Sequence, residues 1–245
     1  MKNEWFKDWF ASQDYLDVYR HRNDNDAKTF LKTILNIVDI PQNAKVLDAA
    51  CGAGRHSENL ARLNYNVVGF DLSMTLLKIA SEKFKYLNYS GNFFRSDIRK
   101  ICLKSKFDLI LLLFTSFGYF ENDDENFLFP ETAFNLLKKN GFFVLDFLNS
   151  KYVIDNLISR SEKTIGNKKI IENRAIENNR VKKKIVIKAE NYENEFNESV
   201  KLYAKNFILD KLSEIGFHVY RILGDYEGNE FNENRSARLI LVLRK

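Results

Sequence analysis

The sequence has few of the residues that stabilise small or irregular folds. Only two of its 245 residues are cysteine, Cys51 and Cys102, and only two are proline. No CxxC pair and no histidine cluster lies near either cysteine, so neither a disulfide framework nor a structural zinc site is expected. Hydrophobic residues make up 45% of the chain and aromatic residues 14%, which is enough for a packed core and argues against disorder.

Long hydrophobic runs are also missing. The N-terminal MKNEWFKDWF is interrupted by charges every few residues, so it resembles neither a signal peptide nor a membrane anchor. The longest aliphatic run, residues 109–114, is far shorter than the roughly 20 residues that a membrane-spanning helix needs. We therefore expect a cytoplasmic protein without membrane contact.

Positive charge exceeds negative charge: the formal net charge is +5 and the isoelectric point is about 9.0. Much of the excess lies in residues 160–188, where ten Lys and Arg face three Glu. Net charge affects solubility and non-specific contacts before it indicates a function. Nucleic acid is thus an alternative partner, and a disfavoured one, because RVKKKIVIK (residues 180–188) lacks the interleaved aromatics that stack on bases.

The first part of the chain alternates between strand and helix patterns. Residues 4–38 are predicted to be helical, and Pro41 follows as a break. Short apolar strands separated by helices of about ten residues indicate βαβ units and a parallel sheet. The predicted strands are residues 45–50, 66–71, 92–95, 107–114 and 141–148, and the predicted helices are residues 55–63, 74–85 and 124–137.

The pattern changes after about residue 159. Residues 163–173, 181–192 and 199–203 are predicted as antiparallel strands of a segment inserted at 160–204. A helix over 206–215 ends at Gly216, and strands over 217–223 and 238–243 follow. We expect one α/β domain over residues 1–245, with a parallel sheet and an inserted antiparallel sheet.

The stretch VLDAACGAGRHSE, residues 46–58, forms a glycine-rich bend where the first predicted strand ends. Ligands of open parallel sheets bind beyond the carboxyl ends of the strands. Gly52 and Gly54 allow the backbone to approach a ligand closely. A dinucleotide motif needs a third glycine where this chain has Ser57, and no GK[ST] ending of a phosphate-binding loop is present.

Asp48 decides between the possible ligands. A carboxylate at this strand end repels a pyrophosphate but attracts an ammonium group, which S-adenosylmethionine carries without any phosphate. Asp71, in GFDLS, can accept both ribose hydroxyls, although an acid at this place also occurs in NAD enzymes. Asp97, in RSDI, can accept from the adenine amino group while Ile98 packs on the ring.

Four motifs in order give a family resemblance. Residues 46–54, GFDLS at 69–73, SDI at 96–98 and LLKKNGFFVLDF at 136–147 resemble motifs of the class I S-adenosylmethionine-dependent methyltransferases. The resemblance covers roughly residues 45–148. It is strongest to the small-molecule branch around glycine N-methyltransferases and aminosugar N,N-dimethyltransferases. This resemblance implies a Rossmann-like, seven-stranded, mostly parallel sheet with an antiparallel last strand, together with an N-terminal helical lid over residues 1–38 and the inserted antiparallel sheet. Cys51 is a departure, because the family usually has glycine there, and we expect a buried apolar cysteine.

The resemblance implies further cofactor contacts, from Ala50, Cys51, Leu72, Met74 and Phe114. By analogy with the lids of these relatives, Tyr15 or Tyr19 contacts the methionine end of the cofactor and Arg20 its carboxylate. Candidates for a base or for binding an amine are His21, His56 and Asp146, and none is assigned a catalytic role.

The exit of the fourth predicted strand, LLFTSFGYF at 112–120, bears on the acceptor. It lacks the [DN]PP[YF] and Pro-Cys motifs of nucleic-acid methyltransferases and the aspartate of metal-dependent O-methyltransferases. An aromatic pocket of Phe114, Phe117, Tyr119 and Phe120 for a small-molecule acceptor, methylated on N or O, is predicted instead. The alternatives are an RNA-associated methyltransferase or nucleic-acid-binding protein and, less favoured, an NAD(P)-dependent oxidoreductase. The sequence does not determine the oligomeric state.

Overall fold

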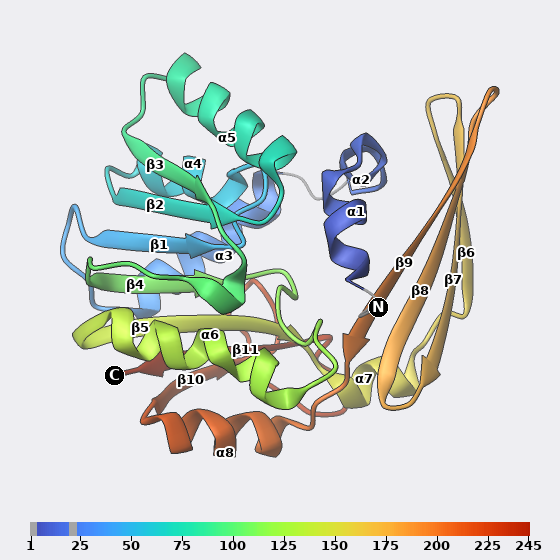
Figure 1. The fold of residues 1–245 in the computed structure, drawn as a ribbon. Helices are drawn as coiled ribbons and strands as arrows, with labels where there is room; N and C mark the ends of the chain where they lie inside the picture. The colour runs from blue at the N-terminus through green and yellow to red at the C-terminus, as the bar shows by residue number, and fades with distance from the viewer. Residues whose placement is uncertain (1–3, 20–23) are drawn as a thin grey trace.

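The computed structural model describes residues 4–19 and 24–245. Its main sheet has seven strands in the order β10-β11-β5-β4-β1-β2-β3 (Figure 1). Only β11 runs against its neighbours, β5 and β10, which confirms the predicted fold class. The strands are β1 (Lys45–Ala49), β2 (Asn66–Asp71), β3 (Gly91–Arg95), β4 (Phe107–Leu112), β5 (Leu137–Leu148), β10 (His218–Leu223) and β11 (Arg238–Arg244).

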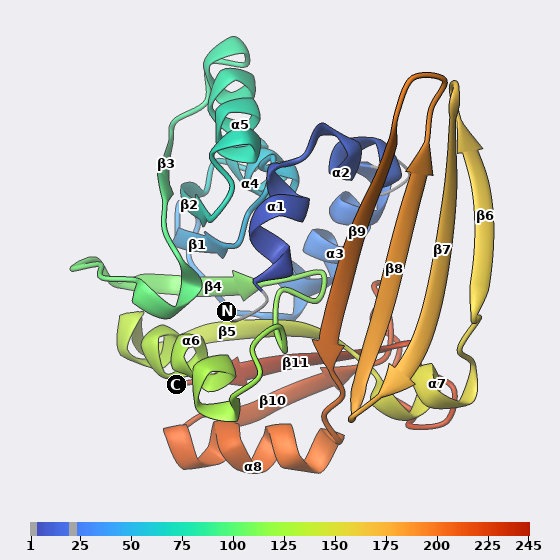
Figure 2. The same ribbon diagram turned by 45° about the vertical axis from the view of Figure 1, so that its right-hand side comes forward.

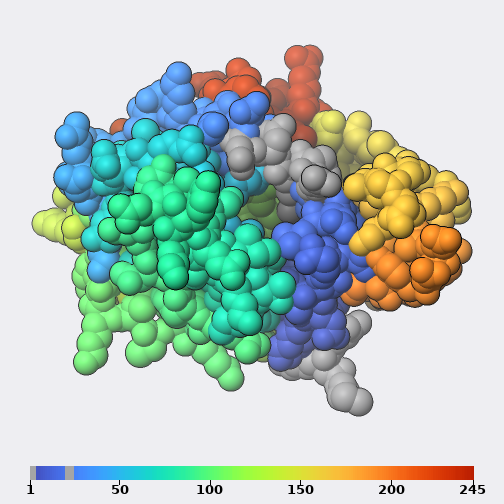
Figure 3. All heavy atoms as spheres, turned by 90° about the horizontal axis from the view of Figure 1, so that it is seen from above, coloured from blue at the N-terminus to red at the C-terminus, as the bar shows by residue number. Residues whose placement is uncertain are grey.

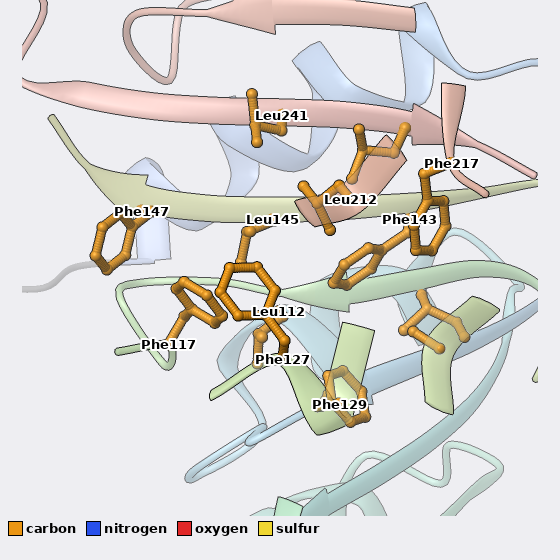
Figure 4. Close-up of a cluster of buried hydrophobic side chains, with 14 of the residues drawn as sticks. Leu112, Phe117, Phe127, Phe129, Phe143, Leu145, Phe147, Leu212, Phe217 and Leu241 are labelled. Atoms are coloured by element: carbon orange, nitrogen blue, oxygen red, sulfur yellow. The ribbon is translucent and has the colours of Figure 1, made fainter. Parts of the chain in front are cut away.

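Helices cover both faces of this sheet. On one face lie α3 (Asp24–Ile37), α4 (Arg55–Arg62) and α5 (Met74–Tyr86), and on the other lie η1 (Ile98–Lys100), α6 (Asp123–Leu136) and α8 (Lys205–Ile215). Successive residues of a central strand point to opposite faces, so Val46 packs with the first group of helices and Leu47 with the second. Figure 4 shows the core between the sheet and this second group of helices, where Phe129, Phe143, Leu212 and other apolar side chains meet.

A second sheet is inserted between β5 and α8, after the short helix α7 (Ser150–Asp155). It has four antiparallel strands in the order β6-β7-β8-β9. They are β6 (Arg160–Ile165), β7 (Lys168–Glu177), β8 (Arg180–Lys188) and β9 (Glu193–Lys201). Figures 1 and 2 show that this inserted sheet stands beside the main sheet, with its strands crossing the direction of the main strands.

The number and limits of the predicted inserted strands were wrong. The predicted strand 163–173 contains the turn at Gly166, which has φ +60° and separates β6 from β7. The predicted strand 181–192 ends at Lys188, and the third predicted strand, 199–203, is the end of β9 and the residues after it. Apolar and polar residues alternate on both sides of each turn, so the periodicity did not reveal where the chain reverses.

The N-terminal helices divide into two groups. The helices α1 (Trp5–Ala11) and α2 (Gln13–Val18) lie between the main sheet and the inserted sheet (Figures 2 and 3). Trp9 and Val18 are buried there against Ile170, Ile185 and Ile187 of the inserted sheet. By contrast, α3 packs on the main sheet. Within the predicted lid of residues 1–38, therefore, only α1 and α2 lie where a lid is expected, and we refer to these two helices as the lid.

Gly54 provides a test of the packing between α4 and α5. It has φ +73°, and a Cβ atom added there would lie 2.9 Å from the Cβ atom of Ala80 on α5. We expect Gly54→Ala to lower the free energy of unfolding by about 2–4 kcal/mol, because backbone strain and overpacking add. Gly166→Ala is the matched control: its φ is +60° and nothing lies within 4 Å, so only the strain of about 1–2 kcal/mol is expected. Equal losses in urea denaturation would contradict the packing role.

Candidate active site

A cavity of about 660 Å³ lies at the carboxyl ends of β1, β2 and β4, between the main sheet, the lid and the inserted sheet. Its volume is typical of small-molecule sites. Among the described residues that were predicted to bind the cofactor, Gly54 and Met74 do not line this cavity, and the others do. Those that line it are Asp48, Ala50, Cys51, Gly52, Asp71, Leu72, Asp97, Ile98, Phe114 and Tyr19.

The bend after β1 is formed by residues with positive φ: Ala50 (53°), Gly52 (55°) and Gly54 (73°). Gly54 does not line the cavity; it precedes α4 and allows that helix to approach α5 closely. Met74 does not line it either, because it is the first residue of α5 and its side chain is 45% exposed. The prediction that these two residues contact the cofactor therefore has no support in the cavity geometry.

Asp48 is buried at the end of β1, with 2% of its surface exposed. Its carboxylate accepts a hydrogen bond of 2.6 Å from the hydroxyl of Ser57 on α4. Burial raises the pKa of Asp48 to about 6, although Ser57 counteracts this. Ser57 stands where a dinucleotide motif would have its third glycine, so the residue that excludes that motif also holds the acid.

Asp71 joins the bend to the end of β2. Its two carboxylate oxygens accept from the backbone amides of Gly52 and Ser73, each at 2.8 Å. Burial raises the pKa of Asp71, and these backbone hydrogen bonds oppose the rise. Each oxygen of a carboxylate has about two acceptor positions, so Asp71 can accept two further hydrogen bonds from a ligand in the cavity.

Asp97 and Ile98 line the cavity after β3, and Asp97 is held by an arginine. Arg99 donates to both oxygens of Asp97, at 2.6 and 3.0 Å. Burial alone would raise the pKa of Asp97, but the hydrogen bonds from Arg99 lower it. Arg99 also pairs with Glu4, next to α1, at 2.7 Å and lies 4.4 Å from the ring centre of Phe120. It therefore connects this end of the cavity to the lid.

Aromatic residues of the lid face the aromatic loop that follows β4. The Trp5 ring lies 4.9 Å from that of Tyr119, and the Phe6 ring 5.7 Å from that of Phe120. Tyr119 and Phe120 line the cavity as predicted, whereas Phe117 is 3% exposed and belongs to the core.

Tyr19 lies at the cavity but is engaged by the inserted sheet. Its hydroxyl donates to Glu198 at 2.5 Å and accepts from Lys183 at 2.6 Å. Glu198 also accepts from Trp9 at 2.7 Å, so one carboxylate ties both lid helices to the inserted sheet. Arg20 and His21 lie outside the described residues.

Asp146 is not an acceptor-binding residue, contrary to the prediction. It is fully buried, does not line the cavity and pairs with Arg238 at 2.6 Å. Its other carboxylate oxygen accepts from the amide of Phe114 at 2.8 Å. Phe114 and Thr115 have φ of 53° and 64°, so the predicted strand 107–114 ends at Leu112 and Asp146 holds the strained backbone that follows.

His56 lines the cavity as a neutral side chain. It is 7% exposed, and burial together with the nearby Arg55 lowers its pKa to about 3. A histidine with so low a pKa is a poor proton acceptor at neutral pH. Its low pKa therefore makes His56 a poor candidate for the base.

Residues 46–141 match the family model described as a methyltransferase domain. The glycine/sarcosine N-methyltransferase of Aphanothece halophytica is 26% identical over 157 residues, which are 63% of this chain and 57% of that protein. These matches show that residues 46–141 resemble a methyltransferase domain and that the chain is similar to S-adenosylmethionine-dependent methyltransferases. The matched parts span about half the length of the curated relatives.

Solved structures share the fold of this chain. An S-adenosylmethionine-dependent methyltransferase from Clostridium acetobutylicum has a TM-score of 0.80 at 20% identity, covering 94% of this chain and 95% of that one. An amino pentose methyltransferase from Micromonospora echinaspora, with S-adenosylmethionine bound, has a TM-score of 0.69 at 17% identity, covering 95% and 97%.

The cavity fits S-adenosylmethionine, which is bound in the amino pentose methyltransferase structure. A buried carboxylate at Asp48 suits its ammonium group, and the open acceptor positions of Asp71 suit two hydroxyls. Gly52 has no side chain, so it leaves room for a ligand between Asp48 and Asp71. Among residues 4–19 and 24–245, no group of His, Cys, Asp and Glu is placed to hold a metal ion, and no helix is long and apolar enough to cross a membrane.

The positive charge of the inserted sheet is largely balanced by carboxylates across the strands. Lys184 pairs with Glu195 and Lys188 with Glu193, at 2.7 and 2.8 Å. Lys182 pairs with Glu177 at 2.8 Å. Residues 160–188 contain ten Lys and Arg against three Glu. The acids of β9, which pair with the lysines of β8, lie outside this range and offset part of that excess. This pairing weakens the case for a nucleic-acid surface.

Part of the cavity wall was not predicted. It comes from α7 and from the inner face of the inserted sheet, and it includes Tyr152, Ser161, Arg174, Lys183 and Glu198. These residues are far from the glycine-rich bend in the sequence and belong to no motif. Only the docking of the inserted sheet brings them to the cavity, so the sequence carried no signal for them.

Asp48 generates a prediction about pH. Its pKa is near 6 in the free protein, so below that pH it must lose a proton before it can pair with an ammonium group. We expect the affinity for S-adenosylhomocysteine, which keeps this ammonium, to fall as the pH decreases below 6, by up to about tenfold per unit. Calorimetric titration from pH 5 to 8 measures it.

Asp48→Asn should weaken binding at pH 8 by about tenfold or more and flatten the profile below pH 6. Because the pKa of Asp71 is also raised, Asp71→Asn serves as the comparison that retains the contribution of Asp48. An unchanged pH profile in Asp48→Asn would contradict the ammonium assignment.

The ion pair of the buried Asp146 with the partly buried Arg238 leads to another prediction. Asp146→Ala should lower the free energy of unfolding by about 3 kcal/mol, because it leaves Arg238 without its carboxylate. The double variant Asp146→Ala, Arg238→Met should recover part of that loss, as measured by urea denaturation. If the two single losses simply add in the double variant, the two residues do not act as a pair.

Proposed function

We propose that this protein transfers the methyl group of S-adenosylmethionine to the nitrogen of a small amine. The observation that carries the proposal is the cavity, which has one wall at the glycine-rich bend and the opposite wall on the lid and the inserted sheet. A volume of about 660 Å³ accommodates a nucleoside cofactor together with a small molecule. The cofactor-binding residues predicted from the sequence are part of this proposal.

The proposed acceptor class draws on two kinds of support. One relative named above is called a glycine/sarcosine N-methyltransferase and another an amino pentose methyltransferase, and both names point to an acceptor that carries an amino group. The cavity also offers the faces of Phe114, Tyr15 and Tyr119, and aromatic faces stabilise cationic groups. Methyl transfer to a neutral amine gives a stable cationic product without a base, whereas a hydroxyl must also lose its proton, and His56 is a poor proton acceptor. The cavity therefore suits a nitrogen acceptor better than a hydroxyl.

The bound cofactor supplies an electrophilic methyl group on a positively charged sulfur. The protein contributes binding, alignment and exclusion of water. Asp48 and Asp71 hold the two ends of the cofactor that flank its sulfur, and the strained backbone at Phe114 and Thr115 fixes the floor of the cavity. Holding two reactants in line can supply effective molarities on the order of 10⁵ M or more. A neutral amine brings its own lone pair, so no protein base is needed before the transfer.

Methyl transfer to a panel of acceptors tests the proposal. Purified protein is incubated with S-adenosylmethionine labelled on its methyl group and with matched pairs in which an amino group is replaced by a hydroxyl, including glycine with glycolate and amino sugars with the parent sugars. We expect label in amines and none in their hydroxyl partners. Transfer should increase as the pH approaches the pKa of the amine, because the neutral form reacts.

Bulk RNA is the control for the nucleic-acid alternative, and thermal shift is the control for cofactor binding. S-adenosylhomocysteine at a hundred times its dissociation constant should stabilise the protein by about 2.7 kcal/mol, whereas NAD should not stabilise it. Asp71→Ala should remove most of this shift. Label found in RNA, or only in the hydroxyl compounds, would overturn the proposed acceptor class.

A further inference from the structure

The loop that follows β4 forms an aromatic wall of the cavity, and its backbone lies outside the main sheet. Tyr119 contacts the lid through Trp5, and Phe120 lies under Arg99. Gly118, which precedes them, has φ +84°, and a Cβ atom there would lie 3.2 Å from the carbonyl oxygen of Lys201. This close approach puts the loop against the inserted sheet.

A single arginine of the inserted sheet holds this loop. Arg180 is the first residue of β8 and is 4% exposed. Its guanidinium donates to the carbonyl oxygens of Gly118 at 3.3 Å, Tyr119 at 2.8 Å and Phe120 at 3.1 Å. It also donates to the hydroxyl and the carbonyl oxygen of Ser199, at 2.7 and 2.9 Å. Three consecutive loop carbonyls are thus fixed by one side chain.

The charge environment of Arg180 indicates that it orients the loop and does not mainly stabilise the fold. The carboxylate that pairs with it, Glu121, is 3.9 Å away and its side chain is 82% exposed, so the buried charge is compensated mainly by neutral carbonyl groups. Removing a cation from water is costly, and stability alone would favour an apolar side chain at this place. A planar guanidinium, however, presents donors in several fixed directions, which a lysine cannot reproduce.

We propose that Arg180 is a positioning residue, which holds residues 118–120 so that Tyr119 and Phe120 close the cavity around the bound cofactor. This inference rests on the proposed function, because it assumes that S-adenosylmethionine occupies the cavity. Asn126 of α6 supports the same loop from its other side, by accepting from the Phe120 amide at 3.0 Å and donating to its carbonyl oxygen at 2.9 Å. The inserted sheet thereby takes part in cofactor binding through this loop.

Arg180→Lys tests the inference, because it keeps the charge and loses the fork of donors. We expect its dissociation constant for S-adenosylhomocysteine to rise about tenfold at 20 °C. The only tryptophans, Trp5 and Trp9, both lie on α1, so tryptophan emission reports on the lid. The emission change on ligand binding should be smaller in this variant, because Tyr119 is no longer held against Trp5.

Two matched controls separate positioning from stability. Ser199→Ala removes one partner of Arg180 and leaves its bonds to the loop, and Arg160→Lys changes an exposed arginine of the same sheet, whose partner is Glu162. Both should bind S-adenosylhomocysteine as the wild type does. Arg180→Gln is the second variant if Arg180→Lys does not fold, because burying a neutral amide costs less than burying a charge; it should also weaken binding.

Unchanged affinity and an unchanged emission response in a folded Arg180 variant, even with a lower melting temperature, would overturn the inference and leave the proposed function intact. Equal weakening by Ser199→Ala would overturn it as well. Failure of the wild-type protein to bind S-adenosylhomocysteine would instead refute the proposed function.

Discussion

The hydrogen bond from the Gly52 amide to the Asp71 carboxylate joins the carboxyl ends of β1 and β2, and the geometry of the cavity depends on it. It fixes the bend above the strands and keeps a buried acid at the cavity wall. The neighbouring Asp48 is fixed in turn by Ser57, at the start of α4. Two carboxylates are thus held in a largely buried place, where their charge is incompletely compensated by the protein. Such a site favours a ligand that supplies a positive charge and hydroxyl donors.

The opposite wall follows a different physical principle. The lid and the inserted sheet share a small apolar core around Trp9 and Ile185, and Glu198 adds hydrogen bonds from Trp9 and Tyr19. The lid therefore packs on the inserted sheet, and it contacts the main sheet's helices through a few polar bonds, such as the Ser73 hydroxyl to the Phe10 carbonyl oxygen at 2.7 Å. Arg180 connects the same inserted sheet to the loop after β4. One wall is thus built by local motifs and the other by long-range packing.

Prediction from the sequence succeeded where the signal was local. The strand 66–71 was predicted with the limits that β2 has, and Gly216 ends α8 in the left-handed conformation as expected. The prediction was wrong for Asp146, which pairs with Arg238; Met74 and Gly54 do not line the cavity, and their contact with the cofactor stays a prediction. An acid at a strand end can face a cavity or pair with a cation from a distant strand, and the local sequence around Asp146 is the same in both cases. Arg238, 92 positions later, decides between them.

The sequence by itself determined the alternation of strands and helices, the glycine-rich bend and the acids at the strand ends, because each depends on backbone conformation and on neighbours within a few residues. Only the tertiary structure decided which acids are neutralised, where the lid ends and which residues of the inserted sheet reach the cavity. Those outcomes depend on contacts between segments 60 to 180 positions apart, such as Arg180 with Phe120 and Tyr19 with Glu198. Contacts of that kind leave no periodic pattern in the chain.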